Sequence, residues 1–307
     1  MENNKWVVNV PVATVWTNYN SARALDKLAV QNPVQIQEWL EGLTYETSLE
    51  LCNNNLVQTQ ALLGEEVLIT EEKEGWSHVV CLSQPSSKDE RGYPGWIPTV
   101  QLTRNQNWSL SEGPAAVIQS KKTLLTTDKG DDLEVCYQTI LPLISQENGR
   151  VRVKIPAGSG ELNEGDVKIY MSLSSIPKGN GKGIVEAGEQ FVGLPYLWGG
   201  VSSFGYDCSG FSYTMCKANG YIIPRDAHDQ LNTGSEADLN NLLPGDLLYF
   251  AYEEGRGSIH HVGIYYGDGK LLHSPNTGKC IEIIPLAGTL YEKELCAARR
   301  YGAETEE

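Results

Sequence analysis

The sequence predicts an α+β protein in which short strands fill the first half and a helix combines with strands in the last third. Residues 63–69, 75–80 and 93–98 have the composition of short strands separated by tight turns. Cys208 opens a helical stretch. Residues 259–266 are rich in β-branched and aromatic side chains, which favour a strand.

Residues 1–105 are predicted to form a small all-β barrel with a helical insertion. Residues 10–15 supply the first strand of this barrel. Residues 21–55 place apolar side chains at helical spacing, and Asn32-Pro33 starts a second helix within them. The insertion therefore lies between the first strand and the later ones.

Residues 106–178 are predicted to form a second, more degenerate barrel. Three of its strands are recognisable, at 140–144, 151–155 and 167–170. A Pro-Lys-Gly-Asn-Gly linker at 177–181 follows. The remaining chain, 179–307, is predicted to be a third domain that carries the chemistry.

Cys208 is the candidate nucleophile. It lies in the first turn of its predicted helix, beside unpaired backbone N–H groups and the positive end of the helix dipole. Both favour the thiolate, and such cysteines have pKa values below the usual value of about 8.5. The alternative is a core cysteine, because Phe211 and Met215 share its helical face.

Two histidines on neighbouring strands are the candidate bases. Side chains alternate along a strand, so His261 and His260 point to opposite faces. A Gly-Asp-Gly turn at 267–269 leads into a second strand that carries His273. One imidazole can then orient the other beside the thiol, which is the logic of a cysteine peptidase triad. His260 is predicted to be a surface or structural residue.

Other chemistries remain open at this point. Cys208 and the histidines at 260, 261 and 273 are possible zinc ligands, but the short spacings of zinc sites are absent. We therefore predict no metal and no other cofactor. An acyltransferase or amidase uses the same constellation, whereas a pure wall-binding module has no need of it.

Six motifs in the last 125 residues resemble the NlpC-type family of papain-like cell-wall cysteine peptidases. They are Pro-Tyr-Leu-Trp-Gly-Gly (195–200), Asp-Cys-Ser-Gly-Phe (207–211), Pro-Arg-Asp (224–226), Leu-Pro-Gly-Asp-Leu (243–247), His-Val-Gly-Ile-Tyr (261–265) and His273. The resemblance implies Cys208 as nucleophile, His261 as base and His273 as the orienting residue. It also implies that Tyr196 and the Cys208 N–H hold the oxyanion.

The upstream strands, closed by Gly-Trp-Ile-Pro at 95–98, resemble bacterial SH3-like barrels. Two such barrels before an NlpC-type domain resemble the γ-D-glutamyl-L-diamino acid endopeptidases of the YkfC type. That resemblance implies release of L-Ala-D-Glu from peptidoglycan stem peptides with a free amino terminus. It implies that Asp226 and Tyr93 bind the ammonium in a groove that the first barrel closes.

The same resemblance suggests further substrate contacts. Asp207 and Ser209 match positions that contact the D-glutamyl unit. Glu65 or Glu66 supplies a further carboxylate, and the sequence does not decide between them. Ala227 departs from the polar residue of some relatives and removes a substrate hydrogen bond.

Composition limits the partners and the compartment. The net charge of −15, from 24 basic and 39 acidic residues, excludes nucleic-acid binding and suits small muropeptides better than a polyanionic wall.

No apolar run is long enough to span a membrane, and the first residues lack the pattern of a signal peptide. Seven cysteines without close pairs indicate thiols in a reducing compartment. We expect a cytoplasmic recycling enzyme; the alternative is a secreted endopeptidase acting on intact murein. The sequence distinguishes neither lysine from diaminopimelate, nor the oligomeric state, nor a ligand of the second barrel.

Overall fold

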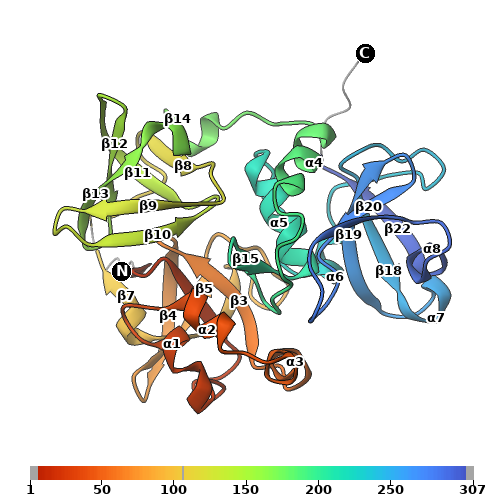
Figure 1. The fold of residues 1–307 in the computed structure, drawn as a ribbon, viewed down its shortest axis with the longest axis horizontal. Coiled ribbons are helices and arrows are strands. Elements are labelled where there is room, and N and C mark those ends of the chain that lie inside the picture. Colours follow the sequence, from red (N-terminus) through yellow and green to blue (C-terminus); the bar gives the residue numbers. More distant parts are fainter. Residues whose placement is uncertain (1–5, 106, 302–307) are drawn as a thin grey trace. The chain divides into compact units, whose positions relative to one another are not determined.

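A computed structural model describes residues 6–105 and 107–301 (Figure 1). The outer ends of the predicted domains, 1–5, 106 and 302–307, lie outside the described residues. The chain divides into two compact units. The first comprises Met1–Ser83, Lys88–Ile176 and Ser202–Phe204, and the second Gln84–Ser87, Pro177–Val201 and Gly205–Glu307.

The first sheet of the first unit is an antiparallel barrel of seven strands in the order β3-β2-β6-β5-β4-β1-β7. The strands are β1 Trp6–Val8, β2 Val12–Trp16, β3 Val57–Leu62, β4 Glu66–Lys73, β5 Trp76–Cys81, β6 Tyr93–Pro98 and β7 Leu102–Arg104. The strands expected from the sequence are present. The sequence did not predict β1, β3 and β7, because β1 and β7 are short and β3 carries two glutamines. The strand expected to be first is therefore the second of the barrel, because β1 precedes it.

The predicted helical insertion lies between β2 and β3. It contains the helices α1 Lys27–Val30, α2 Ile36–Glu41 and α3 Tyr45–Asn53. The Asp26 carboxylate, which is fully buried, fixes the insertion. It accepts from the Arg23 guanidinium at 2.8 and 2.9 Å and from Trp39 Nε1 at 2.8 Å. The charge of Asp26 is thus paired and hydrogen-bonded, as burial requires.

The second sheet of the first unit also has seven antiparallel strands, in the order β10-β9-β13-β12-β11-β8-β14. They are β8 Ala115–Ile118, β9 Lys122–Thr127, β10 Asp132–Cys136, β11 Ile140–Glu147, β12 Arg150–Ile155, β13 Gly158–Asn163 and β14 Val167–Tyr170. In β12 exposed and buried residues alternate, as in a strand with one face on the core. The three strands expected from the sequence correspond to β11, β12 and β14.

The two barrels share apolar packing within the first unit. Val7 and Leu63 of the first barrel belong to the buried cluster of the second, together with Trp108. The Trp108 indole N–H donates to the Gly64 carbonyl at 2.9 Å. Gly64 has a φ of +86°, and a Cβ there would lie 2.8 Å from the Trp108 ring, so this contact requires glycine.

The second unit is built on a six-stranded antiparallel sheet in the order β17-β22-β18-β19-β20-β21. Its strands are β17 Ser235–Glu236, β18 Leu247–Ala251, β19 Ile259–Gly267, β20 Lys270–His273, β21 Glu282–Pro285 and β22 Leu295–Arg300. A small pair, β15 Val201–Ser202 and β16 Gly205–Tyr206, precedes the helix of Cys208. The expected strands at 259–266 and 270–274 are confirmed as β19 and β20.

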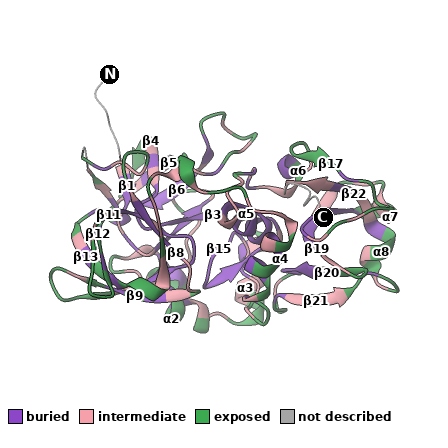
Figure 2. Ribbon diagram, turned by 90° about the horizontal axis from the view of Figure 1, so that it is seen from above, coloured by how far each residue is buried: buried purple, intermediate pink, exposed green. Residues whose placement is uncertain are grey.

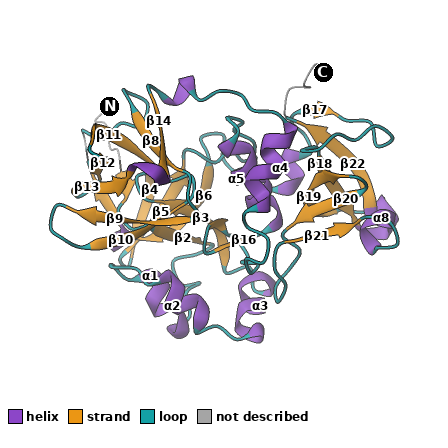
Figure 3. Cartoon of the chain, turned by 45° about the horizontal axis from the view of Figure 1, so that its top comes forward, coloured by secondary structure: helices purple, strands orange, loops and turns teal. Residues whose placement is uncertain are grey.

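Helix α5 packs against β19, and α4 packs against α5 (Figure 3). The helices of this unit are α4 Gly181–Glu189, α5 Cys208–Ala218, α6 Ala227–Gln230, α7 Tyr252–Gly255 and α8 Leu290–Glu294. Nearly all of α5 is buried, and only its two end residues retain intermediate exposure (Figure 2). Among the described residues, no helix has the length and apolar composition needed to cross a membrane.

Candidate active site

Cys208 is the first residue of α5 and is half-buried. Asp207 caps the helix: one carboxylate oxygen accepts from the Gly210 N–H at 2.6 Å, and the other accepts from the Gly199 N–H at 2.9 Å. The sequence-based expectation of a thiol at a helix start is therefore met. The cap also brings a negative charge to this helix end, which opposes the positive end of the dipole.

Asp207 and Ser209 are fixed by Arg225, whose side chain is 1% exposed. The guanidinium donates to both Asp207 oxygens, at 3.1 and 2.6 Å, and to Ser209 Oγ at 2.8 Å. Gln230, also buried, donates to the Ser209 carbonyl at 3.0 Å. Sequence reasoning gave Arg225 and Gln230 no role, although Arg225 belongs to the quoted Pro-Arg-Asp motif.

His261 on β19 and His273 on β20 form a buried pair. His261 Nε2 lies 2.8 Å from His273 Nδ1. The two side chains are 3% and 0% exposed. Gly263 makes room for them, because a Cβ there would lie 2.9 Å from the Cβ of His273 and 2.6 Å from Leu271 Cδ1. The predicted meeting of two imidazoles on adjacent strands is present.

The thiol lies against the strand that carries His261. Helix α5 packs against β19, and the backbone N–H of Val262, the residue after His261, hydrogen-bonds the Cys208 sulfur. The hydroxyl-bearing ring of Tyr291 on α8 contacts both imidazoles, with ring centroids 5.1 Å from His261 and 4.9 Å from His273. The histidine pair is thus enclosed by the helix on one side and by an aromatic ring on another.

Burial controls the protonation of this group. It raises the pKa of the Cys208 thiol to about 12, with the Asp207 charge adding to the effect. It lowers the pKa of His261 well below the usual value and that of His273 to about 3. The direction for Cys208 is opposite to the one that the helix dipole predicts, because desolvation and the capping carboxylate outweigh the dipole. Both directions favour the neutral thiol and the neutral imidazole in the resting site.

His260 belongs to a different group of contacts. Phe250 pairs with His261 and the next residue of β18 pairs with Ile259, so His260 is the extra residue of a β-bulge. Its Nε2 lies 3.0 Å from a buried Glu294 oxygen, and its ring stacks on Tyr252 at 4.2 Å. Bulges re-aim side chains beside active sites. The alternation argument assumed a regular strand, whereas β19 is irregular at His260.

Tyr196 is half-buried and lies close to the Cys208 segment along the backbone. It forms a parallel bridge with Tyr206, two residues before the cysteine. Its N–H donates to the Lys279 carbonyl at 2.9 Å. These backbone contacts hold the Tyr196 loop beside the start of α5.

The residues expected at the substrate's amino terminus come from both units. Tyr93, on β6, is buried, and its hydroxyl accepts from Lys88 Nζ. Asp226 is the N-cap residue of α6, but its side chain makes no capping hydrogen bond. Glu65 is 9% exposed, and a carboxylate oxygen accepts from the Leu62 N–H at 3.3 Å, whereas Glu66 is the first residue of β4. Glu65 thus has a local partner in its own turn.

One group of side chains in the described part of the chain has ligand atoms close enough for a metal ion. Asp226, His228 and Asp229 offer ligand atoms that lie within 4.8 Å of one another. Asp229 already accepts from the Ser87 N–H at 2.9 Å, and His228 is exposed. Exposed groups of this kind are common without an ion, and we infer no metal site. The group shares no residue with the zinc alternative considered from the sequence.

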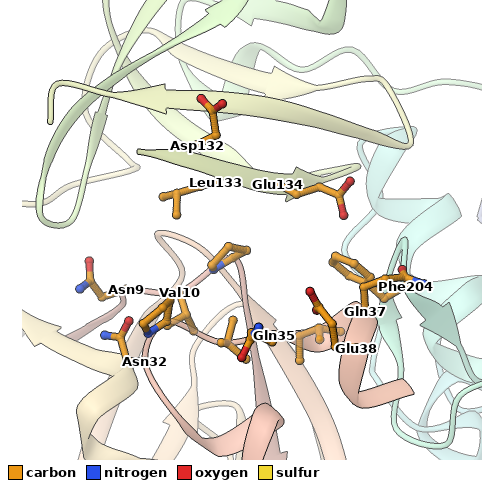
Figure 4. A pocket seen from close by; sticks show the side chains of 14 residues that line it. Asn9, Val10, Asn32, Gln35, Gln37, Glu38, Asp132, Leu133, Glu134 and Phe204 are labelled. Carbon is orange, nitrogen blue, oxygen red and sulfur yellow. The ribbon is translucent and has the colours of Figure 1, made fainter. Parts of the chain in front are cut away.

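A pocket of about 400 Å³ lies in the first unit (Figure 4). Leu133 and Glu134 of β10 lie across it from Gln35 and Glu38 of the helical insertion, with Phe204 at one end. The pocket contains no thiol and no imidazole. It is therefore not the hydrolytic centre.

The second unit combines a thiol at the start of a buried helix with an imidazole pair on the antiparallel sheet against which that helix packs. This arrangement is that of a papain-like thiol hydrolase. Residues 193–300 match the NlpC/P60 family, and residues 118–170 match the YKFC SH3b2 domain. The chain belongs to the NlpC/P60 family, and the resemblance drawn from its six motifs and its barrels is confirmed.

Two curated relatives extend over nearly the whole chain. The chain is 47% identical to the gamma-D-glutamyl-L-lysine dipeptidyl-peptidase of Bacillus subtilis, over 95% of this chain and 97% of the relative. It is 40% identical to the protein of the same name from Bacillus cereus, over 98% and 92%. A crystal structure of an NlpC/P60 family protein from Bacillus cereus superimposes with a TM-score of 0.95 at 40% identity, covering 97% of this chain and all of that one.

Proposed function

We propose that this protein is a cysteine peptidase that hydrolyses the bond between γ-D-glutamate and L-lysine or diaminopimelate in peptidoglycan stem peptides. The product is L-Ala-D-Glu, released from peptides whose L-Ala has a free amino group. The carrying observation is the buried imidazole pair on β19 and β20, the strand β19 being packed against the helix that Cys208 begins, in a chain whose full-length relatives bear the name of that dipeptidyl-peptidase.

The histidine pair supports the assignment of the base. His261 Nε2 is bound to His273, so Nδ1 is the nitrogen left to accept a proton from Cys208. As the sulfur attacks the γ-carbonyl carbon, a C–S bond forms and the thiol proton passes to His261 Nδ1. Because the raised pKa of the thiol and the lowered pKa of the imidazole favour the neutral groups, we assign this transfer to the same step as the attack. His261 then gives the proton to the leaving amine as the C–N bond breaks.

The second half of the reaction regenerates the thiol. Water attacks the thioester, His261 Nδ1 takes a proton from it, and the sulfur leaves and is reprotonated. We assign the oxyanion of both steps to the Cys208 backbone N–H and the Tyr196 hydroxyl. The backbone bridge between Tyr196 and Tyr206 supports this assignment.

We assign the substrate's ammonium to Asp226 and Tyr93, and its D-glutamyl unit to the segment of Asp207 and Ser209. Both Asp207 oxygens are engaged by Arg225 and backbone N–H groups, so we assign to Asp207 a part in shaping the subsite.

We further propose that the enzyme acts in the cytoplasm on soluble stem peptides. All seven cysteines lie in the described part of the chain, and none forms a disulfide. A net charge of −15 disfavours approach to a polyanionic wall. Both observations support recycling of peptides rather than cleavage of intact murein.

The test compares two peptides that differ only at the amino terminus. Free L-Ala-γ-D-Glu-L-Lys is expected to be cut, and its N-acetylated form about a hundredfold more slowly in kcat/KM. Acetylation leaves a half-buried carboxylate without its counter-charge, which corresponds to the lower end of the roughly 3–5 kcal/mol for a broken buried pair. Mass spectrometry of the products measures both rates. Equal values would contradict the requirement for a free amino group and favour a general wall endopeptidase.

A further inference from the structure

The second ring nitrogen of His273 raises a question that the triad leaves open. His273 is fully buried, and its Nε2 has no hydrogen-bond partner among the described residues. Its Nδ1 faces His261 Nε2 at 2.8 Å. A buried imidazole nitrogen that carries a proton needs an acceptor.

The catalytic role of His261 determines which nitrogen carries that proton. For His261 Nδ1 to accept the thiol proton, Nε2 must hold the ring's own hydrogen and donate it to His273 Nδ1. A neutral His273 that accepts at Nδ1 then has its hydrogen on Nε2. In the opposite tautomer, His273 Nδ1 carries the hydrogen and donates it to His261 Nε2. The hydrogen of the neutral His261 ring then lies on His261 Nδ1, which can no longer accept the thiol proton.

Glu282 is placed to receive the Nε2 hydrogen. It is the cross-strand partner of His273 in the register of β20 and β21, so the two side chains leave the same face of the sheet. Glu282 Oε1 lies 3.5 Å from His273 Nε2. Contacts of catalytic groups are often long in a free enzyme and tighten when substrate binds. The Glu282 side chain is 40% exposed, which leaves it free to make this adjustment.

Among the described residues, the other side chains close to His273 do not act as acceptors for its Nε2. The Tyr291 ring meets the imidazole edge-on, with an interplanar angle of 88°. Lys279 is a cation, and it disfavours a second proton on His273. Leu271 and Leu272 precede His273 on β20 and are apolar. The carboxylate opposite is the acceptor within reach.

We propose that Glu282 is a positioning residue that completes a Cys208–His261–His273–Glu282 relay and selects the tautomer in which His261 Nδ1 is the base. This inference rests on the proposed thiol mechanism. Glu282 touches neither substrate nor sulfur and acts through His273. Carboxylates behind ligating or catalytic histidines fix ring tautomers in the same way in other proteins.

The test combines nitrogen NMR with kinetics on the full chain. The protein has five histidines, so ¹⁵N-histidine labelling gives a spectrum simple enough to assign His273 by single His→Gln variants. The resting protein should show His273 protonated at Nε2. Glu282→Ala should lower kcat about tenfold with KM within about twofold, and should shift His273 toward the Nδ1–H form.

Two comparison variants separate the acceptor from other effects. Glu282→Gln keeps a carbonyl acceptor without the charge, and its kcat should stay within about threefold of the wild type. Glu236→Ala removes a carboxylate that is 88% exposed on β17, and its kcat and spectrum should not change.

Three results would overturn the proposal: an Nδ1–H tautomer of His273 in the resting protein, full activity with an unchanged tautomer in Glu282→Ala, or equal losses in the Gln and Ala variants. The tautomer of His273 is measured in the resting wild-type protein. This part of the test therefore does not depend on whether a Glu282 variant folds. Loss of the thiol mechanism itself would instead appear as activity in Cys208→Ala.

Discussion

Replacing Arg225 by methionine should destabilise the second unit by about 3 kcal/mol and lower kcat. The ion pair between Arg225 and Asp207 is buried, with side chains 1% and 9% exposed and a shortest distance of 2.6 Å. Breaking such a pair costs about 3–5 kcal/mol, because a charge remains without its partner. Asp207 still accepts hydrogen bonds from the N–H groups of Gly210 and Gly199, so we expect a loss at the lower end of this range.

Urea unfolding followed by circular dichroism, with hydrogen exchange of the α5 amides, measures this loss where it occurs. Arg225→Lys should lose about half as much, because it keeps the charge without the two parallel hydrogen bonds. Arg256→Met, at a side chain that is 79% exposed, is the matched control and should change stability by less than about 0.5 kcal/mol. A double-mutant cycle with Asp207→Asn should give a coupling of at least about 1.5 kcal/mol. A loss below about 1 kcal/mol for Arg225→Met would refute the role of the pair as the anchor of the α5 start.

Four further outcomes follow from the site. The pKa of Cys208 is raised to about 12 and that of His261 is lowered, so the rate of alkylation by iodoacetamide should rise about tenfold per pH unit from pH 6 to 9. A rate that is constant between pH 5 and 8 would indicate a thiolate–imidazolium pair instead. Because the pKa of His261 is lowered, the midpoint of the loss of turnover in acid should lie well below pH 6.5, and a midpoint at or above 6.5 would contradict the assignment. Gly263→Ala should lower kcat at least tenfold and the melting temperature by no more than a few degrees, because a Cβ at this position displaces His273. An unchanged kcat would show that the histidine pair tolerates the displacement. His261→Ala should abolish turnover and His260→Ala should reduce it only slightly, and the reverse order would show that the bulge presents the other ring to the thiol.

Local pattern predicted the parts of the site that depend on local structure. Cys208 at a helix start and His261 on a strand follow from turn residues and alternation. The position of His273 follows from the Gly-Asp-Gly hairpin. The bulge at His260 was not predictable, because it depends on how β18 pairs with β19.

The supporting residues depend on contacts between distant segments. Arg225 reaches Asp207 across 18 residues, and Gln230 reaches the Ser209 carbonyl across 21. Glu282 meets His273 only because β21 pairs with β20 in one register. The sequence does not show which strands pair or in which register, so it gives no signal for these contacts. The raised pKa of Cys208 was likewise missed, because burial is a property of the packed site.

The most direct test of the thiol mechanism is product analysis with Cys208→Ala. Wild-type protein incubated with L-Ala-γ-D-Glu-L-Lys should release L-Ala-D-Glu and free lysine, detected by mass spectrometry. Folded Cys208→Ala, with unchanged circular dichroism, should release neither at any rate above about a millionth of the wild type, as expected when a covalent nucleophile is removed. Substantial release of the dipeptide by the folded variant, or cleavage by the wild type at a different bond, would contradict the account.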